Sequence, residues 1–146
     1  MDALTVFIKF LQACITPVAM ISGVGLLLLT VTNRMGRTID RARQLIGELD
    51  KPDVKRQNEK KIEILLFIDR SKLLRNSIAW IMIGMMSSCA LIPLLFIMSF
   101  STLDLRIPGY GFFLISITSM LIAFVYFFKD VLLSLKAIKL EAIDYI

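Results

Sequence analysis

A series of charged side chains follows directly on an apolar segment, and these side chains are the first candidates for chemistry. The stretch after Asn33 reads RMGRTIDRAR, so four arginines and one aspartate occur within ten residues. Such arginines suit ion pairs with carboxylates, attraction to anionic lipids, or a ring of charge at the mouth of a pore. The chain contains no His, which excludes imidazole catalysis and His-based metal sites.

The remaining side chains give little support to catalysis. Cys14 and Cys89 occur singly in different apolar segments, where a CxxC metal or redox site is impossible. None of the apolar segments contains an acidic residue, whereas proton-coupled transporters and intramembrane acid–base enzymes place ionisable groups there. We therefore expect no enzyme, no catalytic residue, no bound metal and no cofactor.

The elements that carry the charged residues must be membrane helices. The chain has 146 residues, is 57% hydrophobic and only 20% charged, and has a mean hydropathy of +0.75. Segments 10–33, 76–100 and 107–128 contain no Asp, Glu, Lys or Arg. Each exceeds the roughly 20 apolar residues that a helix needs to cross a bilayer. The sequence predicts an all-α membrane protein, a single membrane domain with three transmembrane helices; the alternative is an unusually apolar soluble bundle.

The distribution of basic residues predicts the orientation. Twelve Lys and Arg residues lie between Arg34 and Arg75, while the loop at 101–106 has Arg106 alone. By the positive-inside rule, the central segment and the C-terminus lie on the cytoplasmic side of an inner membrane, and the N-terminus faces outward. The partners we expect are the bilayer, including its anionic inner-leaflet lipids, further copies of the chain, and other membrane subunits; nothing favours nucleic acid.

The segment from 34 to 75 has the pattern of two amphipathic helices joined by a polar turn. Apolar residues recur at spacings of three and four on both sides of GELDKP, whose Gly and Pro interrupt the helix. The first two membrane helices are therefore expected to extend into an antiparallel cytoplasmic hairpin. With Asn33 and Asn76 at the same depth, the facing residues form two opposite-charge pairs, Asp40 with Arg70 and Arg41 with Asp69.

These segments resemble a known family. The stretch ITPVAMISGVGLLLLTVTNRMGRTIDRARQL and the later FIDRSKLLRNSIAW are similar to the bacterial membrane proteins catalogued as domain of unknown function 2721. The likeness is carried by Pro17, by Asn33, Arg34, Arg37, Asp40, Arg41 and Arg43, and by the residues from Arg70 to Ser77. It covers most of the chain and implies three transmembrane helices, but it implies no activity.

One face of the first helix is unusually polar for a membrane helix. Steps of four and three define a stripe of residues that are nearly all small or polar, which we call the α-helical stripe: Gln12, Thr16, Ala19, Gly23, Leu26, Thr30, Asn33, Arg37, Asp40 and Gln44. Small and hydrogen-bonding residues are typical of helix interfaces in membranes. The stripe is expected to pack against the other two helices or against a copy of itself; alternatively, several copies surround a pore with Arg37 at its inner mouth.

Two prolines are predicted to bend the membrane helices. Pro17 in the first and Pro93 in the second each lack an amide hydrogen and clash with the preceding turn. Two functions remain open at this stage. One is a non-enzymatic protein that acts through homo-oligomerisation or as a small accessory subunit of a membrane complex. The other is a homo-oligomeric ion channel lined by the first helix, which favours anions.

Overall fold

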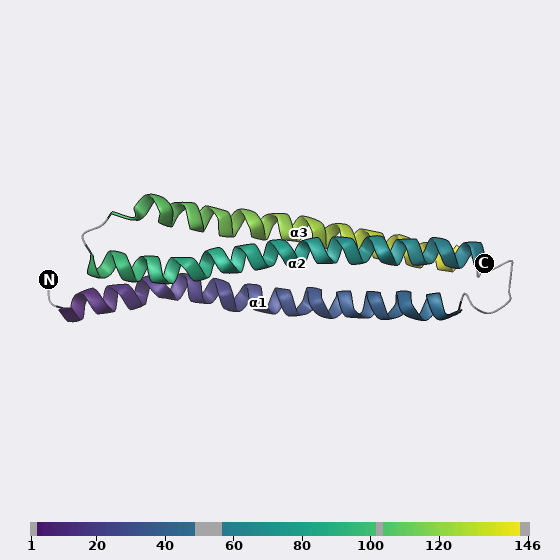
Figure 1. Ribbon diagram of the computed structural model, residues 1–146, viewed down its shortest axis with the longest axis horizontal. Helices are drawn as coiled ribbons and strands as arrows, with labels where there is room; N and C mark the ends of the chain where they lie inside the picture. The colour runs from purple at the N-terminus through teal and green to yellow at the C-terminus, as the bar shows by residue number, and fades with distance from the viewer. Residues whose placement is uncertain (1–2, 49–56, 102–103, 144–146) are drawn as a thin grey trace. The chain divides into compact units, whose positions relative to one another are not determined.

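The protein is built from three long helices. The computed structural model describes residues 3–48, 57–101 and 104–143, with side chains over 4–47, 61–101 and 104–135. The helices are α1 (Ala3–Glu48), α2 (Gln57–Phe100) and α3 (Arg106–Ile143) (Figure 1). All three are long and apolar enough to cross a membrane, as expected of a multi-pass membrane protein. The predicted all-α class with three candidate spans is confirmed.

The helices continue well past the apolar segments. α1 runs without interruption from the first apolar segment into the basic series and ends at Glu48. α3 extends to Ile143, beyond the predicted end of its span at 128, because further leucines keep the sequence suited to a helix. Its first turn is capped by Asp104, whose Oδ1 accepts a hydrogen bond from the amide of Arg106 at 3.2 Å. The predicted hairpin turn falls in 49–56, outside the described residues.

Both prolines lie inside continuous helices. Pro17 is a buried residue of α1, and Pro93 is an exposed residue of α2. The bends expected at these positions stay predictions.

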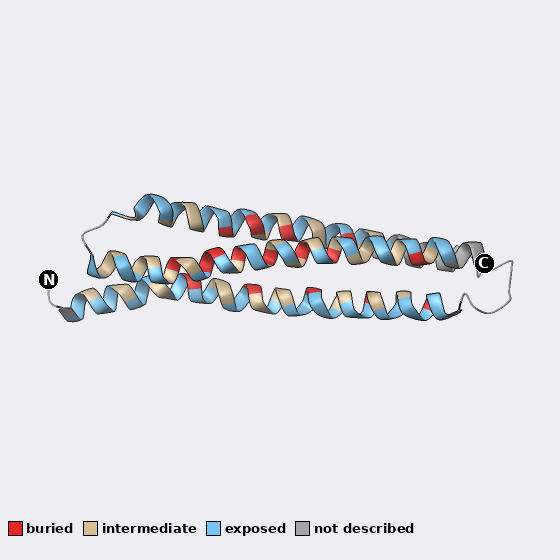
Figure 2. Cartoon of the chain, in the orientation of Figure 1, coloured by how far each residue is buried: buried red, intermediate tan, exposed pale blue. Residues whose placement is uncertain are grey.

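The chain divides into two compact units, and each helix contributes a segment to both. The first unit combines Met1–Leu28 with Ala79–Ile122, and the second combines Leu29–Ile78 with Ala123–Ile146. Figure 2 shows that the buried residues are few and scattered along helices that are otherwise mostly exposed or half-buried. The exposed positions are rich in large apolar side chains such as Leu26 and Leu114, 69% and 63% exposed, which suits contact with lipid.

The first unit is held together by hydroxyl groups at a close helix contact. Ser116 Oγ of α3 donates to the carbonyl oxygen of Gly84 in α2 at 3.0 Å, and it lies 2.7 Å from Ser88 Oγ. A Cβ atom at Gly84 would lie only 3.3 Å from the carbonyl oxygen of Ser116. The absence of a side chain at Gly84 therefore lets α2 and α3 approach closely. From α1, the ring of Phe10 packs edge-on against Phe96, with ring centres 5.6 Å apart.

The second unit has an apolar core that is crossed by a hydrogen bond between α2 and α3. Val31 of α1 and Leu74 of α2 are fully buried. Ser77 Oγ of α2 donates to the carbonyl oxygen of Ala123 in α3 at 2.9 Å. This bond joins two helices without placing an unpaired polar group in an apolar environment. The same unit contains the charged side chains from which a functional site can be built.

Candidate charge cluster and arginine cleft

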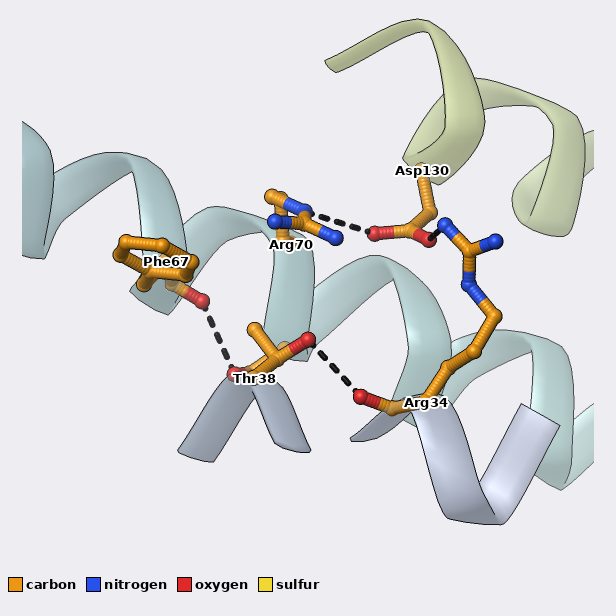
Figure 3. Close-up of polar contacts among 6 residues, drawn as sticks. Arg34, Thr38, Phe67, Arg70 and Asp130 are labelled. Carbon is orange, nitrogen blue, oxygen red and sulfur yellow. Dashed lines mark hydrogen bonds and ion pairs between the residues drawn. The ribbon is translucent and has the colours of Figure 1, made fainter. Parts of the chain in front are cut away.

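A buried carboxylate joins the three helices of the second unit. Asp130 of α3 is completely buried, and each of its oxygens accepts from a different arginine (Figure 3). Oδ2 lies 2.9 Å from Nη2 of Arg34 in α1, and Oδ1 lies 3.1 Å from Nε of Arg70 in α2. We call Arg34, Arg70 and Asp130 the charge cluster. Both contacts are charge-assisted hydrogen bonds, about twice as strong as neutral ones.

Aromatic rings and backbone contacts position the two arginines. The guanidinium carbon of Arg34 lies 5.3 Å from the ring centre of Phe127, and that of Arg70 lies 5.4 Å from the ring centre of Phe67. These distances suit cation–π attraction. Thr38 Oγ1 donates to the carbonyl oxygen of Arg34 at 2.9 Å, so it leaves no hydroxyl group unpaired beside the cluster. The arginines are therefore fixed by contacts on more than one side.

Asp130 belongs to a regular repeat of buried residues along α3. Ser116, Ala123 and Asp130 are buried residues of α3 and are seven residues apart. A seven-residue repeat keeps side chains on one face of a helix that packs along its neighbours. This repeat was the available signal for a buried Asp130, which the sequence analysis left without a role.

An open cleft adjoins the charge cluster. It has a volume of about 220 Å³ and is lined by Arg34, Arg37, Thr38, Phe67 and Arg70. We call it the arginine cleft. Nε of Arg34 is buried and has no hydrogen-bond partner among the described residues. Buried donors are nearly always paired in folded proteins, so this nitrogen is an unsatisfied donor on an arginine that lines the cleft.

The predicted hairpin pairs differ from the contacts in the structure. Arg70, expected beside Asp40, contacts Asp130 instead. Arg41, expected beside Asp69, lies 3.9 Å from Glu63 Oε1, and Asp69 pairs with Lys72 one turn away in its own helix at 3.0 Å. The prediction treated the first two helices as an isolated hairpin. A buried carboxylate from α3 is the stronger partner for Arg70, because it is shielded from water whereas Asp40 is exposed.

The α-helical stripe is exposed along its whole length in the single chain. The stripe residues proposed to face a partner or a pore are all exposed: Gln12, Thr16, Ala19, Gly23, Thr30, Asn33 and Arg37. α1 buries a different face, whose residues are seven apart: Pro17, Val24, Val31, Thr38 and Leu45. A Cβ atom at Gly23 would meet no atom within 4 Å. The stripe therefore is not the face by which α1 packs against α2 and α3.

Metal chemistry has no site in the part of the chain that the structure describes. No three His, Cys, Asp or Glu side chains are grouped there in a way that could hold a metal ion. The site in the second unit carries a net positive charge, because two arginines share one carboxylate and Arg37 adds a further positive charge at the cleft. This arrangement is suited to binding an anion.

Comparison with known proteins gives one match. Neither the curated proteins nor the solved structures contain a match to this sequence. The family model described as "Protein of unknown function (DUF2721)" matches residues 14–140, which include the charge cluster, the arginine cleft, the second and third apolar segments and all but the first four residues of the first. The chain therefore belongs to the DUF2721 family of membrane-type helical proteins, as its resemblance in the first apolar segment and basic series predicted.

Proposed function

We propose that the protein is a non-enzymatic membrane protein that acts by assembling through the α-helical stripe, either with further copies of itself or as a small accessory subunit of a membrane complex. The observation that carries this proposal is the exposure of the stripe while α1 buries another face. Ala19 and Gly23 permit close approach of a second helix, and Gln12 and Thr16 offer hydrogen bonds across it.

The contacts within the chain support two separate roles for the faces of α1, one that packs inside the chain and one that is exposed for binding a partner. Within the second unit, Arg34 reaches α3 through the charge cluster. Within the first unit, Phe10 packs against α2. Neither contact uses a residue of the stripe. The stripe is therefore a surface of interface-type composition that the fold of one chain does not require.

The proposal includes an orientation in the membrane. The protein lies in a bacterial inner membrane with its N-terminus facing outward. The segment from 34 to 75 and the C-terminus lie on the cytoplasmic side. The twelve basic residues of that segment support this orientation. They also favour contact with anionic lipids of the inner leaflet.

A matched pair of glycine substitutions tests assembly. Gly23→Leu adds a bulky side chain to the stripe, whereas Gly25→Leu makes the same change about 200° around the helix. Neither added Cβ meets an atom of the chain within 4 Å, so both variants should fold. Overpacking an interface costs about 1–3 kcal/mol, which weakens self-association by about fivefold to 150-fold.

The measurement is the monomer–oligomer equilibrium in detergent by sedimentation or by energy transfer between labelled copies. Weakened association in Gly23→Leu, with unchanged association in Gly25→Leu, is the expected result. Equal association in both variants would remove the stripe as a face for self-assembly. An accessory role is tested by the same pair, through loss of co-purifying membrane subunits from Gly23→Leu alone.

The second candidate function is a homo-oligomeric channel lined by α1. The observation that favours it is the exposure of polar stripe residues such as Gln12 and Thr16 and of the cationic Arg37. In a planar bilayer, Arg37→Glu should then shift the ion selectivity away from anions without dissociating the oligomer. An assembled protein that passes no current with either residue at this position would reject the channel.

A further inference from the structure

We propose that the arginine cleft is a binding site for a phosphate group, supplied either by the headgroup of an anionic lipid or by a soluble phosphate. This site lies within one chain, so it does not depend on the proposed assembly. It is also more specific than the general attraction between a basic segment and a negatively charged membrane.

The charges around the cleft leave a surplus of positive charge. Three arginines line it, and the nearest paired carboxylate, Asp130, has both oxygens engaged by Arg34 and Arg70. Within the described residues no carboxylate forms an ion pair with Arg37, not even Asp40 three residues further along α1. The cleft therefore has a net charge of about two positive units, which an anionic ligand would neutralise.

The hydrogen-bond donors of the cleft match the geometry of phosphate. Asp130 occupies Nε of Arg70 and Nη2 of Arg34, so other nitrogens of both guanidinium groups remain for a ligand. One of them, Nε of Arg34, is buried without a partner. A guanidinium group presents its donors in a planar fork that fits two phosphate oxygens at once. The hydroxyl proton of Thr38 is donated to the backbone, so recognition falls to the arginines.

The cleft has the size and the fixed walls that a phosphate site needs. Its volume of about 220 Å³ is several times the roughly 30 Å³ that one water molecule occupies. Phe67 forms an apolar wall and holds Arg70 at 5.4 Å from its ring centre. The charge cluster fixes Arg34 and Arg70 before any ligand arrives, which lowers the entropy lost on binding.

The place of the cleft along the helices favours a lipid source. Arg34 follows directly on Asn33, the last residue of the first uncharged segment, and Arg70 lies six residues before the second uncharged segment at 76–100. Where an apolar membrane helix becomes charged, it passes from the hydrocarbon core into the headgroup region. Lipid phosphates lie at that depth, and the open side of the cleft would admit one.

The test measures lipid binding to the purified full-length chain in neutral detergent by native mass spectrometry. Phosphatidylglycerol, phosphatidylcholine and inorganic phosphate are titrated separately. The lipid source predicts that phosphatidylglycerol binds at least about tenfold more tightly than phosphatidylcholine, because both lipids carry the phosphate but only phosphatidylcholine adds a choline cation, which the arginines of the cleft repel. Binding of inorganic phosphate with similar affinity would assign the site to a soluble phosphate. Binding of neither anion would overturn the proposal.

Two arginine variants locate the binding. Arg37→Gln removes a charge from the cleft but leaves the charge cluster intact, and Arg43→Gln removes one from an exposed position of α1 outside the cleft. Affinity for the bound anion should fall about tenfold in Arg37→Gln and stay within about twofold in Arg43→Gln. Equal losses in both variants would show that binding follows total charge, and the site would be rejected.

Chemical modification of the unaltered chain provides a measurement that needs no variant. Phenylglyoxal modifies accessible arginines, and the modified peptides are quantified by mass spectrometry. Saturating phosphatidylglycerol or inorganic phosphate should slow modification of Arg37 at least about fivefold relative to Arg43, because a ligand in the cleft covers the first and not the second. Equal protection of the two residues would contradict a defined site.

Discussion

Replacing Asp130 with Asn should cost far more stability than the loss of one charge from an exposed ion pair of the described helices. The carboxylate is fully buried and accepts one bond from Arg34 and one from Arg70, which are 27% and 12% exposed. Each charge-assisted bond contributes about 1.5–3 kcal/mol, and removing one member of a buried pair costs about 3–5 kcal/mol. Asparagine still accepts one bond, and partly exposed arginines recover some hydration. We therefore expect a loss of about 2–3 kcal/mol.

The assay is unfolding of the full chain by SDS titrated into a mild detergent, followed by circular dichroism. Asp69→Asn is the matched control, because Asp69 pairs with Lys72 at 3.0 Å while both side chains are about 60% exposed. An exposed pair of this kind contributes less than about 0.5 kcal/mol. In a double-mutant cycle, Asp130→Asn and Arg70→Gln should show a coupling of at least about 1 kcal/mol.

Equal losses in Asp130→Asn and Asp69→Asn would refute the reasoning, because the two pairs have similar distances and differ in burial. Purely additive losses in the cycle would show that Arg70 does not depend on Asp130.

Three further outcomes are expected. Gly84→Leu should cost about 1–3 kcal/mol in the same SDS titration, because even a Cβ there would lie 3.3 Å from the Ser116 carbonyl oxygen. Gly36→Leu should cost less than about 0.5 kcal/mol, because a Cβ at Gly36 would meet no atom within 4 Å. Similar costs would contradict a tight α2–α3 contact. Ser77→Ala should lose about 1 kcal/mol in that titration, because it removes a buried hydrogen bond; an unchanged midpoint would show that this bond contributes nothing. With both native cysteines replaced by serine, Lys61→Cys should react with a membrane-impermeant maleimide only in inside-out vesicles; reaction in intact cells would reverse the proposed orientation.

The helices could be predicted from the sequence because the causes are local. Uncharged segments of more than 20 residues require helices in a bilayer, and apolar spacings of three and four extend α1 to Glu48. The predicted third span ends at Phe128, where the charge-free segment stops, whereas α3 continues as a helix to Ile143. Charge marks where a membrane span ends, and it says less about where a helix ends.

The partners of charged residues could not be predicted in the same way, because they depend on which third element packs beside a pair of helices. Arg70 was assigned to Asp40 from the register of two helices alone. The observed partner, Asp130, lies 60 residues further along the chain. A buried carboxylate outcompetes an exposed one, and burial is a property of the packed unit.

The two faces of α1 were also distinguishable only in the structure. Both faces have a regular repeat, and the buried one includes Pro17 and Thr38, which carry no strong apolar signal. The exposed one has the small and polar residues that usually indicate an interface. Composition identified a possible interface, but it could not show that the chain packs through the other face.

Arg37 connects the two proposals, because it belongs both to the α-helical stripe and to the arginine cleft. If copies assemble through the stripe, the positive charges of neighbouring Arg37 side chains oppose one another, and a phosphate bound in each cleft offsets this repulsion. The two proposals are nevertheless tested at different residues. Gly23 lies in the first unit and the whole cleft lies in the second, so Gly23→Leu reports on assembly while phosphate binding is measured within one chain. A chain that binds phosphate but does not assemble would retain the cleft and reject the stripe as an interface.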